Sequence, residues 1–131
     1  MAKLISIKDF DIFSISLRDD GLYQVIVKSE REFTIACMPD LLSAAKEFGG
    51  EKLPFLVICE ELSTTNTELM RYLAKEDSNP YSVADAFVIN SLNQKMLANF
   101  YLKMVQPSRP TQFFMNEHEA VIWLTQYKNP Q

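Results

Sequence analysis

The sequence of 131 residues has few of the residues on which small catalytic and metal sites depend. It contains three glycines, one histidine and two cysteines. Three glycines are too few for a glycine-rich phosphate loop, and a lone histidine with two distant cysteines, Cys37 and Cys59, does not make a set of metal ligands. His118 has no nucleophile motif beside it and is expected on the surface. We therefore predict no cofactor, no metal site and no enzymatic activity.

Long apolar runs and basic clusters are also missing. No apolar run approaches the roughly 20 residues that a membrane-spanning helix needs, and residues 1–6 do not resemble a signal peptide. The net charge is −4 and no four basic residues are consecutive, which argues against a nucleic-acid partner. Both cysteines have apolar neighbours, which is typical of free thiols in a reducing compartment. We predict a soluble, cytoplasmic protein with no membrane span.

The chain does contain what a compact core requires. Apolar residues make up 47% of it, including nine Phe, five Tyr and one Trp. A chain of this length and composition buries enough apolar surface to fold as one domain, here residues 1–131. Phe87 and Trp123 are expected to be buried in that core.

Hydrophobic patterning predicts an α/β fold. Residues 11–17 and 22–27 have the composition of two strands, and the turn-forming residues 18–21 between them predict an antiparallel hairpin. Continuous apolar runs at 53–59 and 86–89 predict buried parallel strands. A last strand is expected at 111–115. Helices are predicted over 38–48, after 63–66, over 91–105 and from 116 onward, with one helical turn over 81–85. The predicted order is β-β-α-β-α-β-α-β-α, a mixed sheet with an N-terminal antiparallel hairpin followed by alternating helices and parallel strands.

Several segments between residues 53 and 127 are similar to a known family. They are residues 53–57, 86–91, 99–103, 110–115 and 119–124. In these segments the chain resembles the SpoIIAA-like branch of the STAS superfamily, the fold of bacterial anti-sigma-factor antagonists. The resemblance implies a single STAS-like domain that acts by binding another protein.

The same resemblance points to three hydroxyl side chains. In partner-switching members of that superfamily, a Ser or Thr at the start of the helix after the central strand is phosphorylated, and the added charge breaks the complex with the partner. The matching residues here are Ser63, Thr64 and Thr65, although no glycine follows them as it does in those members. They are either phosphoacceptors or caps of the next helix; if Thr65 is the cap, Glu68 completes a capping box.

The predicted helix over 91–105 is apolar around more than one face. Met96, Phe100, Tyr101 and Met104 either form a surface for a partner or ligand, or make a thick contact with a neighbouring helix. We predict a non-enzymatic regulatory module that binds another protein or a second copy of itself as a homodimer. The alternative is a carrier of a small apolar ligand or lipid, held in a pocket beneath this helix.

Overall fold

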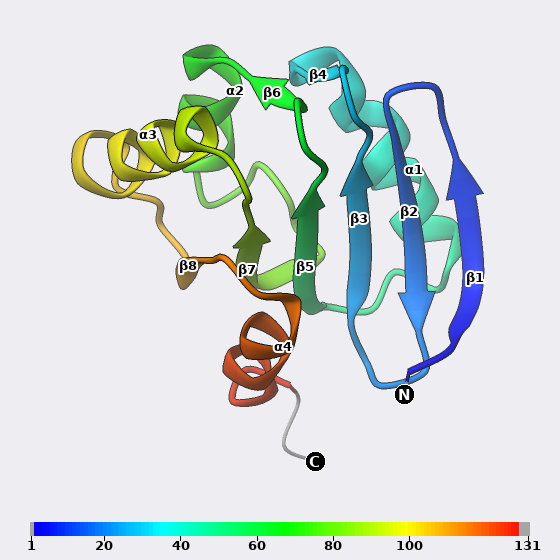
Figure 1. Cartoon of the computed structure of the whole chain (residues 1–131). Coiled ribbons are helices and arrows are strands. Elements are labelled where there is room, and N and C mark those ends of the chain that lie inside the picture. Colours follow the sequence, from blue (N-terminus) through cyan, green and yellow to red (C-terminus); the bar gives the residue numbers. More distant parts are fainter. Residues whose placement is uncertain (1, 129–131) are drawn as a thin grey trace.

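The computed structural model describes residues 2–128, and within them a mixed sheet is covered by helices on both faces (Figure 1). The six strands of the main sheet have the order β1-β2-β3-β5-β7-β8. Their bounds are β1 (Leu4–Asp9), β2 (Phe13–Arg18), β3 (Tyr23–Val27), β5 (Leu53–Cys59), β7 (Ser82–Val88) and β8 (Thr111–Phe114). Two short strands, β4 (Glu32–Phe33) and β6 (Thr64–Thr65), pair separately. The helices are α1 (Met38–Glu47), which follows the 3-10 turn η1 (Ile35–Cys37), then α2 (Thr67–Leu73), α3 (Leu92–Phe100) with the π turn η2 (Tyr101–Val105), and α4 (Glu117–Thr125).

The strand directions confirm the predicted fold class. β2 and β3 are antiparallel, with Ser16 opposite Gln24, whereas β3, β5, β7 and β8 are mutually parallel. The predicted parallel pairing of the 53–59 strand with its neighbour is confirmed by Val57 lying opposite Phe87. The predicted order omitted β1, which turns the hairpin into a three-stranded antiparallel unit. Ile5 and Ile7 alternate with polar residues along β1 but are exposed, so the apolar side of this edge strand does not face the core.

The helical turn predicted over 81–85 is wrong. Ser82 begins β7, which runs without interruption through Asp85 to Val88. A buried carboxylate in a strand resembles, in the sequence alone, the polar break between two elements. Asp85 fits here because Arg109 pairs with it in the folded chain.

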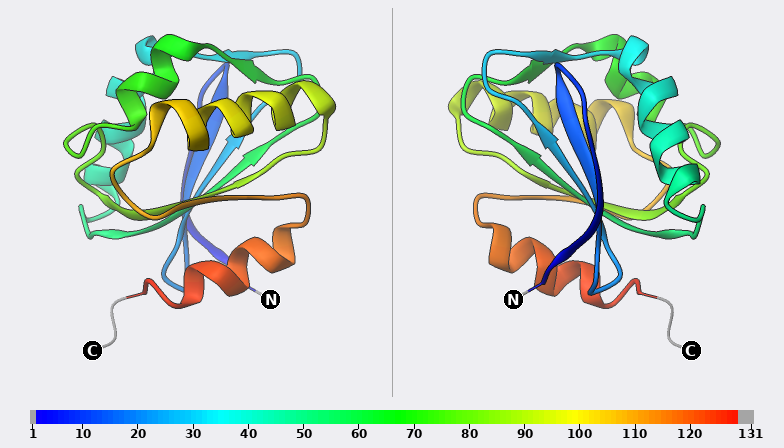
Figure 2. Two further views of the ribbon diagram at one scale, coloured as in Figure 1. Left: turned by 90° about the vertical axis from the view of Figure 1, so that its left-hand side faces the viewer. Right: turned by 90° about the vertical axis from the view of Figure 1, so that its right-hand side faces the viewer.

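The two faces of the sheet are covered unequally (Figure 2). Because side chains alternate along a strand, Phe55 and Val57 of β5 pack with residues of α1 and α2, whereas Leu56 and Ile58 pack with Ala120 and other residues of α4. Helices α1, α2 and α3 share one face, and α4 lies alone on the other (Figure 2). Of these three helices, α1 packs against β2 in the antiparallel part of the sheet, whereas α2 and α3 lie over the parallel strands.

Side-chain caps fix where three of these helices begin. The side-chain oxygens of Asn66, Ser91 and Asn116 accept hydrogen bonds from backbone N–H groups in the first turns of α2, α3 and α4. The cap of α2 is thus Asn66, and the predicted capping box on Thr65 is wrong. The hydroxyl of Thr65 instead donates to the carbonyl of Phe33, 2.6 Å away, and so reinforces the pairing of β4 with β6.

The aromatic residues Phe87 and Trp123, predicted to be buried, are only partly so. The Phe87 ring stacks on Phe113 at 4.9 Å between centroids, and it lines a cavity that leaves part of it uncovered. Trp123 lies at the margin of α4, against Phe114 and Tyr127.

Candidate functional site

A hollow with a largely apolar wall lies between the parallel strands and the helices α2 and α3. Its volume, counted as the space open to the centre of a water-sized sphere, is about 120 Å³. One water molecule needs roughly 10–15 Å³ by this measure. The apolar wall comes from strands β3, β5 and β7 and from helices α1, α2 and α3. It includes Val25, Val27, Phe55, Val57, Phe87, Ile89, Met38, Leu41, Leu69, Met70, Leu73, Leu97 and Ala98.

A buried glutamine, Gln94, is one of the polar residues that line the cavity. The amide nitrogen of Gln94 donates to the carbonyls of Glu60 and Ser63, each at 3.1 Å, and to the Ser63 hydroxyl at 3.2 Å. Its amide oxygen accepts from the backbone N–H of Asn90 at 2.8 Å. Gln94 therefore ties the first turn of α3 to the segment that follows β5, and its own hydrogen-bonding capacity is used in doing so.

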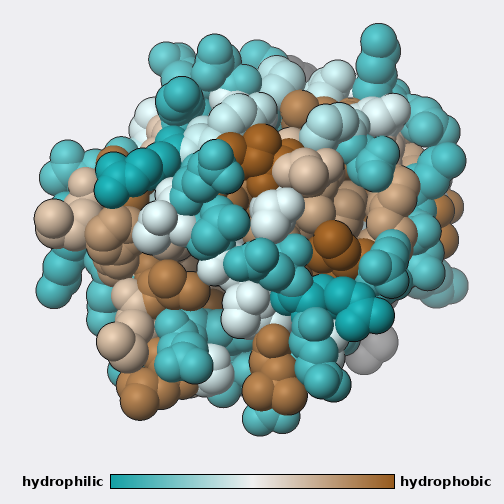
Figure 3. Space-filling model, turned by 90° about the horizontal axis from the view of Figure 1, so that it is seen from above, coloured by the Kyte–Doolittle hydropathy of each residue, from teal (hydrophilic) through white to brown (hydrophobic). Residues whose placement is uncertain are grey.

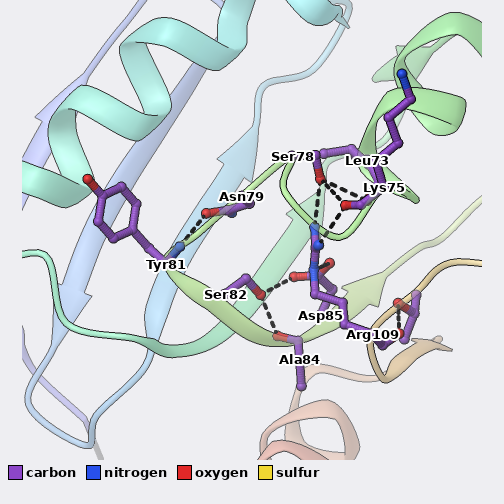
Figure 4. Close-up of polar contacts among 10 residues, drawn as sticks. Leu73, Lys75, Ser78, Asn79, Tyr81, Ser82, Ala84, Asp85 and Arg109 are labelled. Carbon is purple, nitrogen blue, oxygen red and sulfur yellow. Dashed lines mark hydrogen bonds and ion pairs between the residues drawn. The ribbon is translucent and has the colours of Figure 1, made fainter.

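A buried ion pair forms the polar end of the cavity (Figure 4). The Nε of Arg109 donates to one carboxylate oxygen of Asp85 at 2.8 Å, and the hydroxyl of Ser82 donates to the other at 2.6 Å. The remaining guanidinium contacts go to the Lys75 carbonyl, at 3.4 Å, and to the Ser78 hydroxyl, at 3.3 Å. Because both side chains are about nine-tenths buried, the pair replaces the water that each charge has lost.

The hydroxyl of Tyr101 is the exception among the polar groups around the cavity. Tyr101 is the first residue of the π turn η2, lines the cavity and is only 2% exposed. Its hydroxyl oxygen is buried and has no hydrogen-bond partner. Burial raises the pKa of this phenol, the nearby Asp85 raises it further, and Arg109 acts in the opposite direction. The group is therefore an uncharged hydroxyl with both its donor and its acceptor capacity unused.

The thiol of Cys59 lies in the cavity wall and is strongly deactivated. Burial raises its pKa to about 12. The thiolate is the reactive form, so alkylation by iodoacetamide at pH 8 is expected to be about three orders of magnitude slower than for an ordinary thiol of pKa about 8.5. The rate should rise about tenfold for each pH unit toward 12. Mass spectrometry of the labelled protein, with the urea-unfolded chain as the reference, measures this; equal rates in the two states would place the thiol outside the cavity wall.

The three predicted phosphoacceptors differ in their exposure to solvent. Ser63 is 3% exposed and accepts from Gln94, Thr65 is partly buried, and Thr64 on β6 is exposed. All three precede α2 itself, because its first turn is capped by Asn66. Of the three hydroxyls, only that of Thr64 is open to a kinase without local unfolding.

The four predicted surface residues of the 91–105 segment also differ in their exposure. Met96 and Met104 are 61% and 72% exposed, whereas Tyr101 is buried and faces the cavity. Phe100 is partly buried, with the guanidinium of Arg71 of α2 lying 5.8 Å from the centre of its ring. Figure 3, seen from above in the orientation of Figure 1, shows apolar residues in small groups among polar ones. The segment thus has an inner apolar side that lines the cavity and an outer one that is open.

Sequence reasoning missed the polar residues around the cavity. The sequence pattern predicts no role for Gln94, Asp85 and Arg109, and it predicts Tyr101 as part of a surface for a partner or ligand. One signal was present, because Asp85 stands between two alanines in an otherwise apolar run. A charged residue in such a position indicates a buried partner elsewhere in the chain.

Neither a metal cluster nor a membrane span is found in the part of the chain that the structure describes. No three His, Cys, Asp or Glu side chains of residues 2–128 are grouped as metal ligands. Among the same residues, no helix is long and apolar enough to cross a membrane.

Comparison with known proteins places the chain in a family without assigning it an activity. A family model described as a domain of unknown function, DUF7793, matches residues 15–128. No match was found among curated proteins or among solved structures. The matched segment includes every strand from β3 to β8 and all four α-helices, and therefore the whole of the cavity wall. The chain thus belongs to the DUF7793 family of domains of unknown function.

Proposed function

We propose that this protein binds a small, largely apolar molecule in the cavity beneath α2 and α3. The observation that carries this function is an apolar hollow of about 120 Å³. One of the residues that line it, Tyr101, has a buried hydroxyl without a hydrogen-bond partner. A dry apolar cavity of about 150 Å³ in another protein takes up benzene. The expected ligand is therefore of the size of one aromatic ring or a short branched chain.

The cost of keeping such a space empty supports this function. Protein interiors are packed about as densely as organic crystals, and voids larger than a water molecule are few. The hollow is partly open to solvent, so its apolar wall loses contacts with protein atoms and is exposed to water. A ligand that fills the hollow restores contacts and removes this apolar surface from water, which gives even a simple hydrocarbon a favourable binding free energy.

Filling the cavity from the protein side is expected to abolish this binding. In Ala98→Leu, a larger side chain on α3 occupies part of the space, because Ala98 is buried and lines the cavity. With ethylbenzene as the probe, we expect the affinity to fall at least tenfold relative to the natural chain. An NMR titration that follows the backbone amides of α3 measures both the affinity and the place of binding.

An exposed residue of the same helix provides the matched control. Asn93 of α3 is exposed and does not line the cavity, so Asn93→Leu adds a similar apolar side chain outside the cavity and should leave ethylbenzene binding unchanged. Denaturation curves of both variants check that they remain folded. If ethylbenzene shifted no α3 amide in the natural chain, or if both variants bound it equally, the proposed function would be wrong.

A second function, a STAS-like module that binds protein, is favoured by a different observation. The outer side of α3 and η2 exposes Leu92, Met96 and Met104, and Met adapts well to varied partners. The resemblance to the SpoIIAA-like branch supports the same function. Native mass spectrometry of the protein isolated from its own cells distinguishes the two: an added mass of a few hundred daltons or less supports the ligand carrier, and an added polypeptide supports the module.

A further inference from the structure

We propose that the cavity ligand carries an uncharged hydrogen-bond acceptor, such as the carbonyl of a ketone, aldehyde or ester, and that this group binds the hydroxyl of Tyr101. This inference rests on the proposed function and names the chemical class of the ligand. It is drawn from the unpaired hydroxyl and from the charge balance of the groups beside it.

The unpaired hydroxyl indicates a polar group on the ligand. Burying a hydroxyl without a hydrogen bond is costly, so nearly all such groups in native proteins have a partner. Around this cavity the side chains of Gln94, Asp85 and Arg109 follow that rule, and Tyr101 alone does not. A purely hydrocarbon ligand would fill the space but leave the hydroxyl unpaired. A ligand with a carbonyl would fill the space and also give the hydroxyl a hydrogen-bond acceptor.

The ion pair indicates that this polar group is uncharged. Asp85 and Arg109 are the charged residues in the cavity wall, and they neutralise each other at 2.8 Å. Both carboxylate oxygens of Asp85 accept hydrogen bonds from protein groups. A carboxylate or phosphate on the ligand would therefore be buried without a free positive charge to balance it, and an ammonium group would lack a free negative one.

The state of the phenol indicates an acceptor on the ligand. A phenol is protonated throughout the neutral range and burial raises the pKa of Tyr101 further, so its O–H is present to donate. The hydroxyl is enclosed in the empty protein, and a flexible wall residue must move aside for the ligand to reach it.

Three ring compounds of similar size test this inference. Ethylbenzene is apolar, acetophenone has a carbonyl oxygen in nearly the same shape, and benzoate carries a negative charge. Each is titrated by NMR into the natural chain and into Tyr101→Phe, which removes the hydroxyl and keeps the ring. We expect Tyr101→Phe to weaken acetophenone about threefold to tenfold and to leave ethylbenzene within twofold. Benzoate should bind the natural chain at least tenfold more weakly than acetophenone.

The outcomes separate this inference from the function on which it rests. If ethylbenzene binds but Tyr101→Phe weakens acetophenone no more than ethylbenzene, the hydroxyl has no role and this inference is wrong while the cavity function stands. Tighter binding of benzoate than of acetophenone would show that the inference of an uncharged polar group on the ligand is wrong. If none of the three compounds shifts the α3 amides of the natural chain, the proposed function fails and this inference fails with it.

Discussion

Replacing Asp85 with alanine is expected to lower the free energy of unfolding by about 3–5 kcal/mol. The substitution leaves the guanidinium of Arg109, about nine-tenths buried, without its carboxylate partner at 2.8 Å. It also removes the acceptor of the Ser82 hydroxyl. The loss is large because a charge inside the protein has no water to replace the missing partner. Urea denaturation followed by circular dichroism measures it.

Two further variants show whether the loss comes from the unpaired charge. Glu47→Ala breaks the surface pair with Lys8, whose side chains are about half exposed, and should cost less than about 1 kcal/mol. The double variant Asp85→Ala, Arg109→Ala removes both charges, so it should cost clearly less than the sum of the two single variants. The pair would not be buried as described if Asp85→Ala lowered the free energy of unfolding by less than about 1 kcal/mol. The same would follow if the losses of the two single variants added up to that of the double variant.

Truncating Leu124 on α4 is expected to have the next largest effect. Leu124 is fully buried against the sheet, in a cluster with Leu22, Leu56 and Ala120. Because α4 is the only helix in residues 2–128 that covers this face, no neighbouring helix can move in to fill the space. Leu124→Ala should therefore cost about 2–5 kcal/mol, the range for a buried leucine that leaves a cavity. The midpoint and slope of chemical denaturation provide the measurement.

The same helix supplies the control. Ile122 is two residues away and 59% exposed, so Ile122→Ala should change the stability by about 0.5 kcal/mol or less. Comparable losses in the two variants would show that α4 packs on the sheet through a different face.

The fold could be predicted from the sequence where one signal dominates. The run at 53–59 is apolar throughout because β5 lies inside the sheet with both faces covered, and its predicted bounds are those of the structure. The 11–27 region carries a turn between two apolar segments, which fixes a hairpin locally. Single polar residues in the right place, such as Asn116, mark where a helix begins. These features depend on neighbours in the chain, which the sequence displays directly.

The candidate site could not be predicted in the same way, because it depends on partners that are distant in the chain. Whether Asp85 is a surface charge or half of a buried pair depends on Arg109, which a helix and a π turn separate from it. The inward direction of Tyr101 depends on where α3 ends and η2 begins. The sequence did predict a pocket beneath this segment as an alternative, from its excess of apolar residues, but not the polar groups around it.

The strand order also has a consequence for how the chain folds. In the antiparallel part the paired residues are close in sequence, as Ile15 and Val25 are, so only a short loop must close before the pair forms. In the parallel part, Val25 pairs with Val57 and Val57 with Phe87, so each pairing must wait for an intervening helix to be accommodated. The antiparallel unit can thus serve as an early template, with the cavity closing late, when β7, α3 and β8 are added along the edge of β5.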